Sequence, residues 1–117
     1  MTVPAKLDIT ITRGDTEIIV YTVTSDGTTP IDITGRTYAS KIRYDYDAAT
    51  SYAFTSVLTS PTTGVVTLTL AGGPSSVSAS LTPGLAYWDL EETVTASGVV
   101  STLVAGKCTI LGDTTWP

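Results

Sequence analysis

The chain has 117 residues, the length of a single domain, and we expect one domain over residues 1–117. Charged residues make up 15% of it, the formal net charge is −5, and the six basic residues are scattered, so no basic stripe neutralises phosphates and we expect no nucleic-acid binding. No apolar segment is long enough to cross a bilayer and the start lacks a signal-peptide layout, so we expect a soluble protein made without an export signal.

The composition favours an all-β fold. Apolar residues make up 42% of the chain and threonine occupies 24 positions. Thr, Val, Ile and Tyr suit pleated, half-buried surfaces, whereas Gly, Ser, Asp and Pro supply turns. The single cysteine, Cys108, lies in the apolar run "GKCTIL", so it forms no internal disulfide and is expected to be a buried, unreactive strand thiol.

The first two predicted strands span residues 7–12 and 17–24. The first alternates apolar and polar residues, which indicates one face exposed to water. The second carries apolar residues on both faces and is predicted to be covered on both sides. Between them lies Arg13-Gly14-Asp15, which we interpret as a structural turn rather than as a cell-adhesion tripeptide, because Gly14 can take a positive φ there.

A predicted hairpin follows the turn signal Asp26-Gly27, with strands over residues 36–46 and 51–58. Residues 65–70, "VVTLTL", form the next strand, with its even-numbered apolar residues on one face. The connector after it contains "SSVSASL", which is predicted to form one helical turn with a serine cap.

The chain ends in a second predicted hairpin, residues 85–94 and 99–111. Trp88 and Leu90 are expected to point inward, while Asp89 points outward. Strands at roughly ten-residue spacing, separated by turn signals, are typical of a β-sandwich or a small barrel.

Several segments, taken in order, resemble a family of small bacteriophage proteins. They are "ITRGDT", "DG…PIDITG", "KIRYDYD", "TGVVTLTL", "YWDLE" and the final "ASGVV…L..G..TI". Over Leu7 to Leu111 the chain is similar to the N-terminal domain of the phage baseplate upper protein. The resemblance implies an immunoglobulin-like antiparallel β-sandwich of about 7–8 strands. Baseplate upper proteins continue into long C-terminal regions, whereas this sequence ends at Pro117, so we expect a small separate subunit.

The resemblance also implies a function without catalysis. We expect a bacteriophage virion structural subunit of the tail or baseplate, made in the host cytoplasm and working through protein–protein assembly. Its expected partners are other virion structural proteins and further copies of itself, with no nucleic acid and no membrane. Two alternatives stay open, namely a capsid decoration protein and a receptor-binding or carbohydrate-binding module.

The residues themselves agree with a non-enzyme. The chain has no histidine, so Ser/His and Cys/His nucleophile systems and imidazole metal sites are absent. The acidic pairs Asp89 with Glu91, Glu91 with Glu92, and Asp45 with Asp47 are interpreted as exposed residues. We therefore expect no catalytic residues, no cofactor and no metal site.

Four aromatic residues are the candidate contact residues. Tyr44, Tyr46 and Tyr52 surround the small-residue loop in "YDYDAATSYAF", and Trp116 lies near the end of the chain. For the tyrosines, packing on the core or a strand edge, a protein interface and a glycan contact all stay open. For Trp116, we expect docking on its own domain or on a neighbour.

Overall fold

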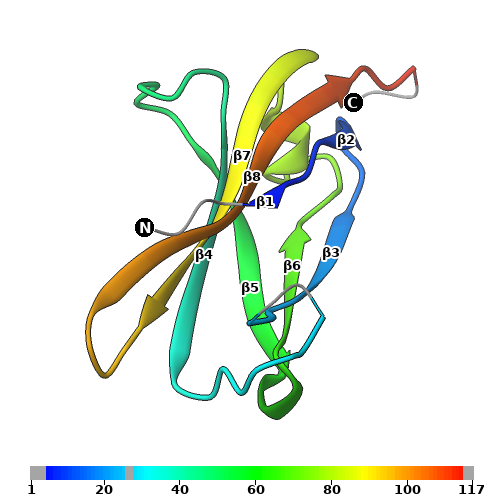
Figure 1. Cartoon of the computed structure of the whole chain (residues 1–117). Helices are drawn as coiled ribbons and strands as arrows, with labels where there is room; N and C mark the ends of the chain where they lie inside the picture. The colour runs from blue at the N-terminus through cyan, green and yellow to red at the C-terminus, as the bar shows by residue number, and fades with distance from the viewer. Residues whose placement is uncertain (1–4, 26–27, 115–117) are drawn as a thin grey trace.

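The structure is a computed structural model that describes residues 5–25 and 28–114, so the predicted turn at Asp26-Gly27 and the candidate residue Trp116 lie outside the described residues. The described residues form β1 (Ala5–Lys6), β2 (Ile9–Thr12), β3 (Glu17–Thr22), β4 (Arg36–Arg43), β5 (Tyr52–Ser60), β6 (Val65–Leu70), β7 (Gly84–Val94) and β8 (Val99–Leu111). Two short 3-10 turns, η1 (Pro61–Thr63) and η2 (Ser78–Ser80), complete the elements, and η2 lies where the helical turn was predicted. The all-β prediction is confirmed (Figure 1). Within these residues no helix is long and apolar enough to span a membrane.

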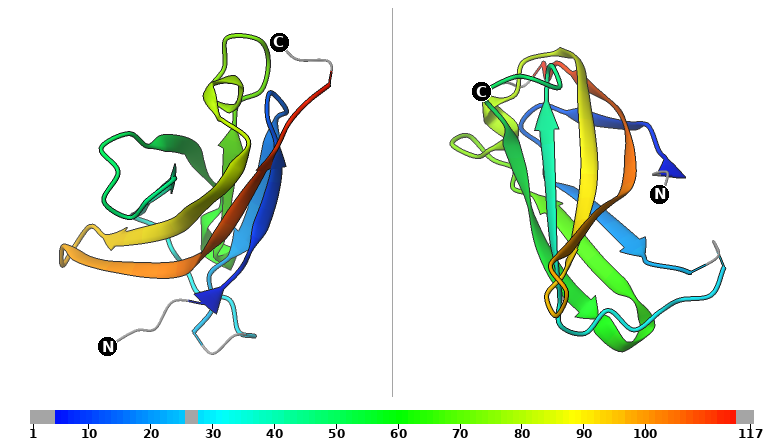
Figure 2. Two further views of the ribbon diagram at one scale, coloured as in Figure 1. Left: turned by 90° about the horizontal axis from the view of Figure 1, so that it is seen from above. Right: turned by 60° about the vertical axis from the view of Figure 1, so that its left-hand side comes forward.

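The strands form one strongly curled sheet. Its order is β1-β8-β7-β4-β5-β6-β3, and β2 also pairs with β8. The curl places β7 and β8 on one side of the molecule and β3 and β6 on the other, in the manner of a half-barrel (Figure 2). The expected antiparallel pairing holds from β3 to β8, but β1 and β2 run parallel to β8.

The curl depends on β5, which belongs to both halves of the sheet. Its first residues, Tyr52 to Phe54, pair with β4, and its later residues, from Thr55 to Ser60, pair with β6. The strand therefore carries the chain from one half of the sheet to the other. As a result, the inner faces of the two halves lie against a common core.

The core contains the inward-facing residues of nearly every strand. The alternation predicted for β4, β6 and β7 is confirmed, because in each of these strands every second residue is less exposed than its neighbours over most of the strand, and in β4 Ser40 and Ile42 are fully buried. Full burial of each large aliphatic side chain contributes about 1.5–3 kcal/mol. The most deeply buried members are Ile11, Ile33, Ile42, Val66, Leu68, Leu70, Leu90, Val104 and Ile110, with Trp88 and Phe54 beside them.

The prediction that β3 is covered on both faces is wrong. Ile18 and Val20, on its outer face, are 59% and 64% exposed. Both side chains are more than half exposed, so no described element packs as a second layer over this outer face. Its apolar outer residues therefore form part of the surface.

The Arg-Gly-Asp tripeptide is a turn between β2 and β3, as predicted. Gly14 has a φ of 89°, which favours glycine. Its amide donates to the hydroxyl oxygen of Ser78 (3.0 Å), and its carbonyl accepts from the amide of Gly73 (2.9 Å). The backbone of the turn is thus bonded to the connector that contains η2, which gives it a structural role.

Candidate functional site

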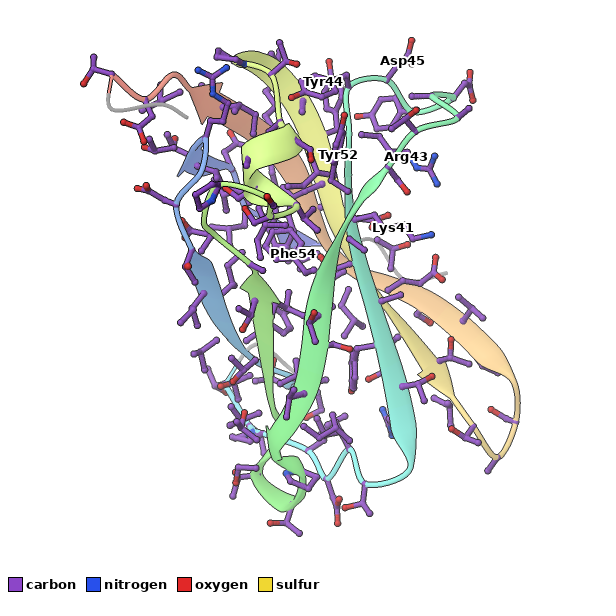
Figure 3. All side chains as sticks on the ribbon, turned by 180° about the vertical axis from the view of Figure 1, so that it is seen from behind. Lys41, Arg43, Tyr44, Asp45, Tyr52 and Phe54 are labelled. Carbon is purple, nitrogen blue, oxygen red and sulfur yellow. The ribbon has the colours of Figure 1, made fainter. Side chains whose placement is uncertain are left out.

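Tyr44 and Tyr52 are partly buried and pack against the core. Their rings meet edge to face, with centroids 6.0 Å apart and planes at 88°. The Tyr44 hydroxyl donates to the carbonyl of Thr82 (2.6 Å) and accepts from its amide (2.7 Å). Both rings are partly buried against the core, on the side of β4 and β5 away from Lys41 and Arg43 (Figure 3). The packing interpretation therefore describes these two tyrosines.

Tyr46 is placed differently, because the loop after β4 folds back over the outer face of the sheet. Its side chain is 77% exposed, and its ring stacks on Tyr87 with centroids 4.7 Å apart and planes at 27°. The loop is held by a hydrogen bond from the Arg43 guanidinium to the carbonyl of Ala48. The Ala48 amide in turn donates to the carbonyl of Asp45 (3.0 Å).

A groove of about 300 Å³ lies between this loop and the outer face of β4, β7 and β8. We call it the tyrosine groove. Small residues and backbone form its floor, since Ala39, Ala105 and Gly106 line it. The remaining lining comes from the two stacked tyrosines, the edge of Trp88, and four charged residues, Lys41, Arg43, Asp89 and Glu91.

The charged residues of the tyrosine groove come from neighbouring strands in register. Lys41 lies directly opposite Asp89, and Ala39 lies opposite Glu91. Asp89 and Glu91 are half-buried rather than exposed, which corrects the sequence interpretation of this pair. Burial raises the pKa of Asp89, the charge of Glu91 raises it further, and Arg43 and Lys41 lower it by less.

Glu92 occupies the opposite, inner face of β7 and is 6% exposed, so its interpretation as an exposed acidic residue is wrong. The two-residue period of the strand explains this, because Glu92 follows Leu90 on the inner face. Its carboxylate lies 3.2 Å from the Arg36 guanidinium and accepts a 2.6 Å hydrogen bond from the Tyr38 hydroxyl. This network compensates the buried charge and leaves Glu92 a structural residue.

A second surface lies on the outer face of β5, β6 and β3. Its exposed apolar residues are Ile18, Val20 and Val57, and we call it the apolar face. Val20 and Val57 both pair in register with Thr67, and Ile18 pairs with the next outward threonine of β6. The apolar face adjoins the edge of β3 that does not pair with β6, and no strand of the described residues pairs with that edge.

The remaining chemistry of the described residues is sparse. No three His, Cys, Asp or Glu side chains come together there in a way that could hold a metal ion. Cys108 is completely buried, as predicted, and burial followed by the nearby charge of Glu17 raises the pKa of its thiol to about 12. A thiol in this state is a poor nucleophile.

Of the three candidate aromatic residues that the structure describes, one lies beside other functional groups on the outer face of the sheet. That residue is Tyr46, and its partners Tyr87, Lys41 and Arg43 were not singled out from the sequence. The alternation of β7 already placed Tyr87 on the same face as Asp89. The missing information was the register between β4 and β7 and the fold-back of the loop, both of which are long-range features.

The chain was compared with protein families, curated proteins and solved structures. No protein-family model matches the chain, and no curated protein is similar to it. Among solved structures, the crystal structure of Listeria monocytogenes InlP is similar with a TM-score of 0.44 and 17% sequence identity. The similarity covers 92% of this chain and 26% of that chain, so this chain spans about a quarter of that protein's length.

Proposed function

We propose that the protein is a non-enzymatic structural subunit of a bacteriophage particle, placed in the tail or baseplate, that works by protein–protein assembly. The sequence resemblance over Leu7 to Leu111 supports the location. The observation that carries the assembly is the apolar face, where Ile18, Val20 and Val57 are each more than half exposed and where β3 pairs with no strand other than β6 among the described residues. Such surfaces mark protein contacts, because burying exposed apolar area is favourable and an open strand edge offers its backbone groups for pairing with another strand.

The strand order supports an immunoglobulin-like fold as part of this proposal. Lettering the strands A to G in chain order, with β1 and β2 together as A, gives the neighbours B-E-D and C-F-G. These are the neighbour relations of the two sheets of an immunoglobulin constant-type sandwich. The arrangement differs in that A pairs with G, and D pairs with C as well as with E.

A second copy of the chain is the occupant that we propose for the apolar face. Edge strands that avoid pairing usually carry lysine, proline or a bulge, and β3, "EIIVYT", has none of these. An antiparallel pair of β3 strands about a two-fold axis at Ile19 would bring Ile18 opposite the partner subunit's Val20. The single charged residue of the strand, Glu17, would then lie opposite the partner subunit's Tyr21. The two Glu17 carboxylates would therefore be well separated and would not repel each other strongly.

The self-association is tested by light-scattering mass measured over a concentration series. We expect the protein to form an oligomer whose mass falls to that of the monomer in the Ile18→Thr/Val20→Thr double variant. A matched control is Val99→Thr/Val100→Thr, which alters two valines that are each 55% exposed on the other half of the sheet. A wild-type protein that stays monomeric throughout, or a control variant that dissociates instead, would contradict the assigned surface.

The location is tested by imaging the source particle with a labelled antibody raised against the protein. Label at the tail end supports the tail or baseplate proposal. Label over the head would replace it with a capsid decoration role, because the same assembly surface would then act on the shell. A particle without label would overturn the structural role altogether.

A further inference from the structure

We propose that the tyrosine groove is a binding site for a neutral saccharide, with a sugar ring stacked on Tyr46 and its hydroxyl groups bonded to the charged rim. This inference goes beyond the assembly function and does not depend on it. The tyrosine groove lies on the outer face of β4, β7 and β8, whereas the apolar face belongs to β5, β6 and β3.

The first argument is the shape of the site. Its volume of about 300 Å³ is at the lower end for pockets that hold small ligands. The floor is flat and open because Ala39, Ala105 and Gly106 carry no large side chain. A ligand lying on this floor meets both aromatic and charged side chains, since Arg43 pairs in register with Tyr87 and Lys41 with Asp89.

The second argument concerns the exposed ring of Tyr46. One face of it stacks on Tyr87, which fixes its orientation, yet 77% of the residue remains exposed. An aromatic ring carries negative charge on its faces, and the C–H groups of a sugar ring carry a slight positive charge, so the two attract when stacked. Tyr46 therefore offers an oriented stacking surface at the mouth of the groove.

The third argument concerns the charge of the lining. Lys41 and Arg43 are balanced by Asp89 and Glu91, so the groove has no net charge that would attract an ionic ligand. It does offer hydrogen-bond donors and acceptors side by side, because Lys41 lies directly opposite Asp89. A hydroxyl group both donates and accepts, so a polyhydroxylated neutral ligand matches this lining.

The fourth argument is that the site is preorganised. The charged residues stand on two paired strands, and the loop that carries Tyr46 is fixed by the hydrogen bond from Arg43 to Ala48. At the end of β4, Tyr44 anchors the start of the loop to Thr82. A rigid site loses little conformational freedom when a ligand binds.

The test is an NMR titration of the isotope-labelled full chain with four neutral saccharides, namely lactose, maltose, cellobiose and N,N′-diacetylchitobiose. At least one of them should cause saturable shifts in the backbone amides of Tyr46, Tyr87 and Asp89. Tyr46→Ala should weaken that binding about tenfold. Asp47→Asn, which changes an exposed carboxylate in the same loop outside the groove lining, is the matched control and should leave the affinity unchanged.

The outcomes separate this proposal from the assembly proposal. Saturable shifts at the groove that are lost in Tyr46→Ala and kept in Ile18→Thr/Val20→Thr support the saccharide site. Absence of saturable shifts with all four saccharides overturns it, as do shifts confined to other strands. An unchanged affinity in a folded Tyr46→Ala variant overturns it as well, and the amide spectrum of the variant shows whether it is folded.

Discussion

The indole Nε1 of Trp88 donates a hydrogen bond to the carbonyl oxygen of Leu7, 2.8 Å away, and so ties the middle of β7 to the link between β1 and β2. This contact requires the link to cross β8 very closely. It does so at Gly106, the residue that pairs with Trp88 in register. A Cβ atom added to Gly106 would lie 2.0 Å from the carbonyl oxygen of Leu7.

We therefore expect Gly106→Ala to destabilise the fold by about 1–3 kcal/mol, because the clash is with backbone rather than with a flexible side chain. Unfolding in urea, followed by tryptophan fluorescence, measures the loss of free energy of unfolding. Gly112→Ala is the control, since a Cβ there would meet only the Pro83 side chain at 3.6 Å, an ordinary contact. Equal stability of the two variants would contradict the close crossing.

Glu92 should be far more sensitive to substitution than its neighbour Glu91. Glu92→Ala leaves the Arg36 guanidinium and the Tyr38 hydroxyl without their acceptor inside the sheet, and we expect a loss of about 2 kcal/mol. Glu91→Ala, on the outer face of the same strand, should change the free energy of unfolding by less than about 0.5 kcal/mol. Urea unfolding of both variants checks this, and similar losses would show that Glu92 is not the buried member of the pair.

The same network makes the protein sensitive to alkaline pH. Burial raises the pKa of Tyr38 above its usual range, and the hydrogen bond to Glu92 raises it further. The folded state thus keeps a proton that the unfolded state releases, so the free energy of unfolding should fall as the pH rises above about 10. Tyr38→Phe should make this decline shallower while costing about 1 kcal/mol at neutral pH. Thermal unfolding of the wild type and the Tyr38→Phe variant at a series of alkaline pH values measures this. An equal loss of stability in both proteins would contradict the assignment.

The strands and their inner faces could be predicted from the sequence because a two-residue alternation is a local property. Leu68 and Leu90 are buried where the alternation put them. The exposure of Ile18 could not be predicted, since an apolar strand face is buried or exposed according to whether another layer packs over it. That depends on how segments far apart in the chain are arranged in space.

The candidate site was predictable only in part, because it too depends on contacts between segments far apart in the chain. Continued alternation would place Tyr44 and Tyr46 on one face, as residues two apart in a strand. However, β4 ends at Arg43 and the chain turns back, so Tyr44 remains inside and Tyr46 reaches the outer face. Its stacking partner Tyr87 comes from a strand about forty residues later, and no local pattern specifies that contact.

The ionised carboxylate of Asp89 should lower the free energy of unfolding at neutral pH. Its folded-state pKa is raised, chiefly by burial, so the folded state binds a proton more tightly than the unfolded state. The free energy of unfolding should therefore fall as the pH rises from about 3.9 through the raised pKa. Asp89→Asn removes this penalty, and its stability relative to the wild type should improve between acidic and neutral pH.

Asp32→Asn is the control with the opposite sign. Hydrogen bonds from the side chain and then the amide of Thr34 lower the pKa of Asp32, so its contribution is present at neutral pH and is lost as the pH falls. Urea unfolding of both variants from acidic to neutral pH checks the pair. Parallel pH profiles for the two variants would contradict the assigned directions.

Cys108 should react with thiol reagents only after the sheet opens. Its side chain has no exposed surface, and burial raises its pKa to about 12, so the folded protein presents almost no thiolate at neutral pH. It also lies within β8, paired with Ile9 on one side and Ala86 on the other, so exposure requires both pairings to separate. We expect labelling by a chromogenic disulfide reagent to be slow in buffer and to accelerate in urea in proportion to the unfolded fraction.

The Cys108 thiol should be labelled faster in the Gly106→Ala variant than in the Gly112→Ala variant, because Gly106→Ala destabilises the strand that carries the thiol. Rapid labelling of the native wild-type protein, at a rate insensitive to these variants, would show that the thiol is reached by a local motion instead.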